Sequence, residues 1–257
     1  MNRVVVTGLG IISPIGLDIK TAWDQALAGR SGVKKITSFD TTNFDVKIAA
    51  EVEGFDPKSF LDSKQIRKYS RFTQFSIAAA GQALKDANFD DTLPRTDWGC
   101  SIGVGIGDIQ NIYETSKVLE TKGPRRVSPF FIPYVIANMA AGNTAHHFSL
   151  KGPNICTTTA CTSGTHAVGE AWMYIKSGQA KVMVCGGSEA AITELTVAGF
   201  SNMKALSRNN QDPQRASRPF DVNRDGFVIG EGSGVLVLED YDHAVKRGAK
   251  IYAEVVG

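Results

Sequence analysis

Cys161 is the residue of this sequence whose type and setting best suit nucleophilic chemistry. It follows a β-favouring run at residues 155–159, and the small residues after it open a helical stretch that reaches Ile175. A thiol at such a strand-to-helix turn lies near the positive end of a helix macrodipole, which favours the nucleophilic thiolate. The other interpretation is a small cysteine buried beneath the start of the helix, as is common for intracellular cysteines. The local pattern alone leaves both interpretations open.

A group of basic side chains is the second feature with possible chemistry. Lys64, Arg67, Lys68 and Arg71 are spaced by three, four and seven residues in a predicted helix over residues 63–88, with no acidic residue among them. These spacings place all four on one helical face. Most such faces are simply solvated, and the functional alternative is a docking patch for an acidic partner.

Composition excludes several classes of protein. The chain has 257 residues, 42% of them hydrophobic, and a formal net charge of +2, which argues against nucleic acid as a partner. The four cysteines lack metal-type spacing, so no metal site is expected. No secretory signal opens the sequence, and no apolar run approaches the ~18 residues of a membrane span. We therefore expect a reduced, cytoplasmic enzyme or binding protein.

Strands and helices alternate along the chain, and this order predicts a layered α/β fold with helices on both sides of a sheet. Two glycine-rich turns resemble the dinucleotide-binding fingerprint, but Ser13 and Asp108 stand where its last glycine belongs. A nucleotide-binding oxidoreductase is thus a weak alternative.

Strands are expected at residues 3–9, 46–52, 98–104, 181–188, 233–239 and 250–256, and helices at 18–28, 63–88, 108–119, 134–148, 194–203 and 240–247.

The motifs around Cys161 resemble those of the condensing enzymes of the thiolase superfamily, in particular the type II β-ketoacyl-[acyl-carrier-protein] synthases of fatty acid biosynthesis. The resemblance covers the whole chain in the motifs VVVTGLGIISPIG, GVGIG, GPRRVSPFFIP, KGPNICTTTACTSGTHAVGEA, VMVCGGSEA, ASRPFDVNRDGFVIGEGSGVLVLE and KRGAKIYAEVVG. It implies an αβαβα layered sandwich of two similar halves. Residues 1–257 would form the N-terminal half, with a mixed five-stranded sheet, helices on both faces and cap insertions. The C-terminal half is expected beyond residue 257.

The resemblance also implies the chemistry of the site. Cys161 would accept the acyl group as a thioester and then undergo decarboxylative Claisen condensation with malonyl-carrier protein, giving a 3-oxoacyl-carrier protein and CO2. The acyl pocket would comprise Ile106, Phe131, Ala160 and Phe200, with Phe131 reaching it from the partner subunit of a homodimer. Asp108 and Thr196 depart from the small residues expected there, which affects the preferred acyl length.

The same resemblance identifies carrier-protein docking residues and the limits of this chain. Docking residues would be Lys64, Arg67, Lys68, Arg125, Arg126 and Arg208. No cofactor is expected, because phosphopantetheine arrives on the acyl carrier protein.

His166 lies about 140° around the helix from Cys161 and is expected to be a packing residue, whereas Asp221 and Glu231 would be scaffold residues. The family's two histidines and lysine belong to its second half, so this chain alone should not condense. The alternatives are a non-catalytic carrier-protein-binding partner chain, similar to a chain-length factor, and a polyketide ketosynthase.

Overall fold

A six-stranded mixed sheet forms the centre of the computed structural model, which describes residues 1–89 and 94–257. Its strand order is β5-β4-β6-β7-β1-β8. The strands β4, β5 and β6 run parallel to one another, whereas β7 is antiparallel to both β6 and β1, and β8 is antiparallel to β1. The strands are β1 (Val4–Ile12), β4 (Trp98–Gly103), β5 (Asn154–Ile155), β6 (Val182–Glu189), β7 (Gly232–Asp240) and β8 (Ala253–Val255).

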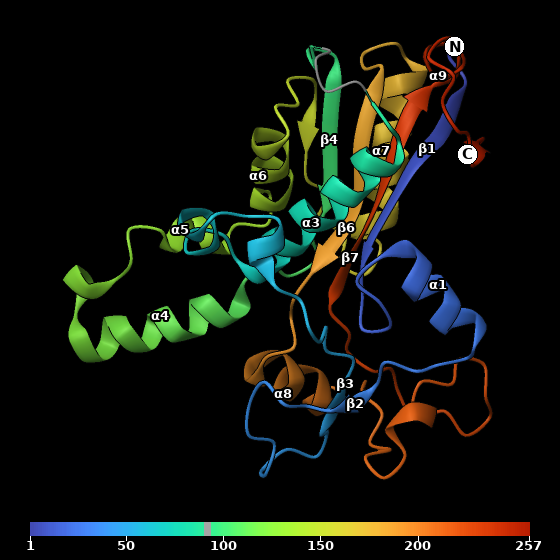
Figure 1. Cartoon of the computed structure of the whole chain (residues 1–257). Helices are drawn as coiled ribbons and strands as arrows, with labels where there is room; N and C mark the ends of the chain where they lie inside the picture. Colours follow the sequence, from blue (N-terminus) through green and yellow to red (C-terminus); the bar gives the residue numbers. More distant parts are fainter. Residues whose placement is uncertain (90–93) are drawn as a thin grey trace.

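Helices cover both faces of this sheet (Figure 1). On one face α3 (Arg71–Asp86) packs against β1, β6 and β7 and against α6 (Met139–His147), and on the other α7 (Ser163–Lys176) packs against β4 and β6. The predicted α/β architecture with a mixed sheet is confirmed. The described part of the sheet has six strands instead of the five expected, and β8 pairs along the free edge of β1.

Two glycines in β1 explain how closely α3 packs. A Cβ atom at Gly8 would lie 2.1 Å from the carbonyl oxygen of Ala83, and one at Gly10 would lie 1.9 Å from that of Ala79. The strand expected over residues 3–9 is too short, since β1 continues through Gly10 to Ile12. The two glycines are required because the helix backbone lies directly on the strand. They therefore serve packing and form no nucleotide-binding turn.

A smaller second core lies beside the main sheet. The strands β2 (Lys34–Lys35) and β3 (Ile48–Ala49) form a two-stranded sheet, and α8 (Glu194–Asn202) contributes Val197 to the same buried cluster. In Figure 1 this region lies below the main sheet, and α4 (Ile109–Lys122) extends to one side of the molecule. The remaining elements are α1 (Ile19–Leu27), η1 (Pro57–Ser59), α2 (Ser63–Ile66), η2 (Pro124–Arg126), α5 (Phe131–Val135), η3 (Pro213–Arg215) and α9 (Tyr241–Lys246).

Two predicted helices are each divided in two. The helix expected over residues 63–88 is α2 followed by α3, with Ser70 in an extended conformation at the start of α3. The helix expected over residues 134–148 is replaced by α5 and α6, and Ile136 is extended where α5 ends. Both interruptions are local backbone changes within otherwise helical sequence, so the periodicity of the flanking residues did not reveal them.

Candidate active site

Cys161 lies in a tight turn between β5 and α7. The residue before it, Ala160, has a left-handed backbone with φ of 52°. A left-handed conformation costs a non-glycine residue about 1–2 kcal/mol, so neighbouring contacts must hold it. Ser163 supplies them, because its Oγ donates to the Ala160 carbonyl oxygen at 2.6 Å and accepts from the Thr159 N–H at 2.9 Å. The turn therefore presents residue 161 in a fixed position.

The start of α7 packs directly on the backbones of β4 and β6. A Cβ atom at Gly103 would lie 2.0 Å from the Ser163 carbonyl oxygen, and one at Gly187 would lie 2.9 Å from the Cα atom of Gly164. Glycines at these positions let the helix approach both strands at backbone distance. The position of Cys161 is thus fixed by the sheet as well as by its own turn.

Exposure distinguishes Cys161 from the other three cysteines, all of which lie in the described part of the chain. Cys161 is exposed, Cys156 is half-buried, and Cys100 and Cys185 are buried. Burial raises the pKa of the Cys100 and Cys185 thiols, and it is also the main cause of the raised pKa of Cys156. Three thiols are therefore held in the unreactive protonated form, while Cys161 meets solvent at the start of a helix.

A cavity of about 670 Å³ opens beside Cys161. Three of the four residues predicted for an acyl pocket line it, namely Ile106, Ala160 and Phe200, and Phe131 is not among its lining residues. Thr196 also lines the cavity, and its hydroxyl bonds to the hydroxyl of Thr193 at 3.0 Å. A largely apolar cavity beside an exposed thiol suits a hydrophobic substrate that forms a covalent bond with sulfur.

Glu189, at the end of β6, is a site residue that the sequence reasoning missed. It lines the same cavity, and its carboxylate accepts the backbone N–H groups of three successive residues, 105–107. Burial raises the pKa of this carboxyl, and these hydrogen bonds oppose that effect. The available signal was an acidic residue at the end of the otherwise apolar run VMVCGGSE.

Asp108, beside this turn, caps the start of α4. Its carboxylate accepts the Asn111 N–H at 3.0 Å, and burial raises its pKa. Its polar side chain is therefore accounted for by the helix cap, and it is not among the residues that line the cavity.

His166 contacts its neighbours along the helix and in the turn. Its Nδ1 lies 3.3 Å from the Thr159 hydroxyl, and its Nε2 lies 3.4 Å from a carboxylate oxygen of Glu170. The expectation that it is a packing residue is wrong, because its side chain is 45% exposed. In the part of the chain that the structure describes, its imidazole therefore contacts Thr159 and Glu170 instead of Cys161.

Glu231 binds other parts of the framework. It accepts the Val52 N–H at 2.9 Å and pairs with the Arg71 guanidinium at 2.7 Å. Asp221 likewise accepts the N–H of Asn223 at 2.7 Å. Both carboxylates therefore hold other segments of the same chain in place.

The basic side chains do not share one helical face, so that prediction is wrong. Arg67 is the residue after α2, whereas Arg71 begins α3 and binds Glu231. The Lys68 ammonium lies 5.3 Å from the centre of the Phe130 ring, which connects this segment to the one that carries the exposed Arg125 and Arg126. Lys64 and Arg67 are exposed as well, and Arg208 is paired with Asp45 at 3.0 Å.

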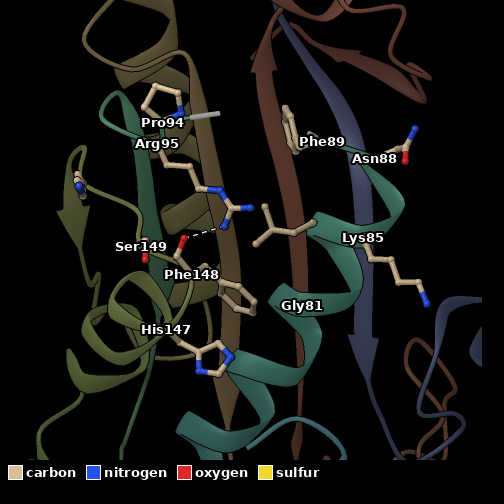
Figure 2. A pocket seen from close by; sticks show the side chains of 11 residues that line it. Gly81, Lys85, Asn88, Phe89, Pro94, Arg95, His147, Phe148 and Ser149 are labelled. Carbon is tan, nitrogen blue, oxygen red and sulfur yellow. Dashed lines mark hydrogen bonds between the residues drawn. The ribbon is translucent and has the colours of Figure 1, made fainter. Parts of the chain in front are cut away.

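A second cavity, of about 590 Å³, shares no lining residue with the one beside Cys161 (Figure 2). The Arg95 side chain points across it and donates to the Phe148 carbonyl oxygen at 2.7 Å (Figure 2). Its described lining residues include no cysteine, so they offer none of the thiol chemistry of Cys161. Within residues 1–89 and 94–257 there is no group of three or more potential metal ligands. No helix in the same described part is long and apolar enough to cross a membrane.

Known proteins resemble this chain in sequence along its whole length. Residues 1–244 match the family model described as "Beta-ketoacyl synthase, N-terminal domain". Proteins named 3-oxoacyl-[acyl-carrier-protein] synthase 2 are 49% identical in Synechocystis sp. and 50% identical in Vibrio cholerae, with 100% of this chain covered. The chain spans 62% of the length of each of these relatives.

Solved structures agree with the sequence comparison. A β-ketoacyl synthase from Burkholderia phymatum has a TM-score of 0.91 at 33% identity, covering 100% of this chain and 64% of that one. A ketosynthase described in complex with its type II polyketide acyl-carrier protein and bound to a hexaketide has a TM-score of 0.86, also at 33% identity. The match covers 100% of this chain and 62% of that chain.

Proposed function

The chain belongs to the β-ketoacyl synthase family, and from this premise we propose that it is the N-terminal part of a 3-oxoacyl-[acyl-carrier-protein] synthase of fatty acid biosynthesis. The observation that carries this proposal is the exposed Cys161, held at the start of α7 and open to an apolar cavity. In our proposal the enzyme is cytoplasmic and forms a homodimer, with no metal and no bound cofactor. Phosphopantetheine comes and goes on the carrier protein.

The step assigned to this chain is acyl transfer. The Cys161 thiolate attacks the carbonyl carbon of a carrier-bound acyl thioester, and a new sulfur–carbon bond forms. The bond between that carbon and the phosphopantetheine sulfur then breaks, and the released carrier thiolate takes up a proton from solvent. The cavity lined by Ile106, Ala160 and Phe200 holds the acyl chain during and after the transfer.

Condensation with a malonyl group also needs acid–base groups that assist the decarboxylation. In our proposal these are two histidines and a lysine in the part of the enzyme that corresponds to the rest of its longer relatives. The present chain therefore accepts an acyl group without extending it. The complete enzyme would decarboxylate the malonyl unit and join its carbanion equivalent to the acyl carbon on Cys161.

The proposed partner is an acidic acyl carrier protein, which meets the exposed basic residues Lys64, Arg67, Arg125 and Arg126. Lys68 joins the segments that carry these residues through its contact with Phe130. Arg208, which pairs with Asp45, is the remaining docking residue of the proposal. The relative solved with its acyl-carrier protein supports this type of partner for the fold.

Two further functions belong to the same family. Solved relatives include a ketosynthase/chain length factor of the ishigamide system, at 33% identity. A non-catalytic carrier-protein-binding chain would not need an exposed cysteine at the start of α7. The polyketide ketosynthase described above is 33% identical to this chain, whereas the two fatty acid enzymes are 49% and 50% identical. The fatty acid enzyme is therefore the proposal we retain.

Intact mass spectrometry after incubation with an acyl carrier protein tests this function. We expect one acyl adduct on the wild type and none on Cys161→Ala. Alkylation with iodoacetamide serves as a control that needs no carrier protein, and it should modify the same residue. A chain that is alkylated at Cys161 but never acylated by any carrier protein would contradict the proposal.

A further inference from the structure

Glu189 makes an unusual set of hydrogen bonds beside the nucleophile. Its Oε2 accepts the N–H groups of Gly105 at 2.9 Å and Ile106 at 2.7 Å, and its Oε1 accepts that of Gly107 at 3.1 Å. Three successive backbone N–H groups form a concave site suited to an anion. Here the anion is a side chain of the protein itself, so one carboxylate holds the whole turn.

The sheet explains why this residue reaches that turn. β4 and β6 are parallel neighbours, with Gly103 opposite Gly187. Their carboxyl ends therefore lie at the same edge of the sheet, where Glu189 ends β6 and residues 105–107 leave β4. Gly107 has a left-handed φ of 81°, which turns the chain toward α4.

The held turn also touches the nucleophile's turn. A Cβ atom at Gly105 would lie 3.1 Å from the Glu189 carboxylate and 3.2 Å from the carbonyl oxygen of Ala160. Residue 105 therefore lies between the carboxylate and the residue that precedes Cys161. Ile106, the next residue, is 40% exposed and lines the cavity.

We propose that Glu189 is a positioning residue, which holds Ile106 in the wall of the cavity beside Cys161 and so sets which acyl chain lengths form the thioester. The proposal rests on the proposed function. In this role Glu189 acts on the backbone of residues 105–107 and not on the reacting sulfur. The carboxylate fixes the backbone of residues 105–107, and because residues 105 and 107 are glycines, Ile106 is the residue whose side chain is positioned.

Glu189→Gln is the direct test, because glutamine has nearly the same shape. It keeps one acceptor oxygen, and it places an NH₂ donor against a backbone N–H that now lacks a partner. Glu51→Gln is the matched control. Glu51 also accepts two successive backbone N–H groups, those of Thr37 and Ser38, both at 3.0 Å, and it does not line the cavity.

The assay measures acylation rates of Cys161 with hexanoyl, decanoyl and hexadecanoyl carrier proteins, and the rate of iodoacetamide alkylation. In Glu189→Gln we expect the ratio between the best and worst chain lengths to change about 10-fold, the effect of roughly one misplaced hydrophobic contact. In Glu189→Gln, alkylation should stay within about 2-fold of the wild type, because the Ser163 hydrogen bonds that hold the turn before Cys161 are kept. Both measurements should stay within the same range in Glu51→Gln. Ile106→Ala should alter the chain-length profile in the same direction.

Each other result overturns the proposal. An unchanged profile in Glu189→Gln would show that the hydrogen bonds do not set the position of Ile106. Equal losses for all three chains and for alkylation would show a general structural role. If Glu189→Gln does not fold, an unchanged profile in Ile106→Ala overturns it instead. A wild type that is alkylated but not acylated would overturn both the proposed function and this inference. That result can be told apart from failure of the inference alone, in which the wild type is still acylated.

Discussion

Adding one methyl group at Gly103 should move the nucleophile without touching it. In Gly103→Ala the new Cβ atom would lie 2.0 Å from the Ser163 carbonyl oxygen, whereas ordinary van der Waals contact begins at 3.4 Å. The first turn of α7 would have to retreat by about 1.4 Å, or β4 would have to bend. Overpacking of this kind costs about 1–3 kcal/mol of folding stability. A displacement of about 1 Å in a reacting group can lower a rate about 100-fold.

Single-turnover acylation and thermal unfolding together test this reasoning. Gly103→Ala should remain folded with a lowered melting temperature, and Cys161 should be acylated about 100-fold more slowly. Gly142→Ala in α6 is the control, since nothing lies within 4 Å of its new Cβ atom. Its helix should gain about 0.5–1 kcal/mol, with the acylation rate unchanged. A folded Gly103→Ala that acylates at the wild-type rate would refute the claim that the sheet fixes the position of Cys161.

Two further predictions concern a helix cap and the docking surface. Asp18 caps α1, and hydrogen bonds from Thr21 lower the pKa of its carboxyl. The charged cap therefore stabilises the folded protein at neutral pH, and this stabilisation is lost as the pH falls through the lowered pKa. Asp18→Ala should lower the free energy of unfolding by about 1 kcal/mol near pH 7. The difference in melting temperature between the variant and the wild type should shrink well below pH 3.8. A difference that does not depend on pH would contradict the role assigned to the charge of Asp18. Reversing the charges of Lys64 and Arg67 to glutamate should slow acylation by acyl-carrier protein about 10-fold at low salt while leaving iodoacetamide alkylation unchanged, and an unaltered rate would remove these residues from the docking surface.

The candidate nucleophile and much of the cavity could be predicted because their residues lie in continuous motifs. Cys161, Ala160 and the start of α7 are neighbours in the chain, and Ile106 and Phe200 follow from the resemblance of the flanking motifs. The left-handed conformation of Ala160 was not predicted, because alanine rarely adopts it without tertiary support from a residue such as Ser163.

Several of the remaining errors share a physical cause, which is contact between segments far apart in the sequence. Glu189 acts on a turn that is 82 to 84 residues away. Gly8 and Gly10 allow α3 to pack on β1, although in sequence they signal the end of a strand. Arg71 lies off the expected basic face because the helix is interrupted at Ser70, and it binds Glu231, which is 160 residues away. Local periodicity contains no information about these partners.

Peptide mapping after incubation with an acyl carrier protein tests the central claim most directly. The account predicts a single acyl group, attached to Cys161, on a chain whose other three cysteines stay unmodified. Cys161→Ala should carry no acyl group under the same conditions. An acyl group on another residue, or none on a wild type whose Cys161 is still alkylated by iodoacetamide, would contradict the assignment of Cys161 as the acyl-accepting nucleophile.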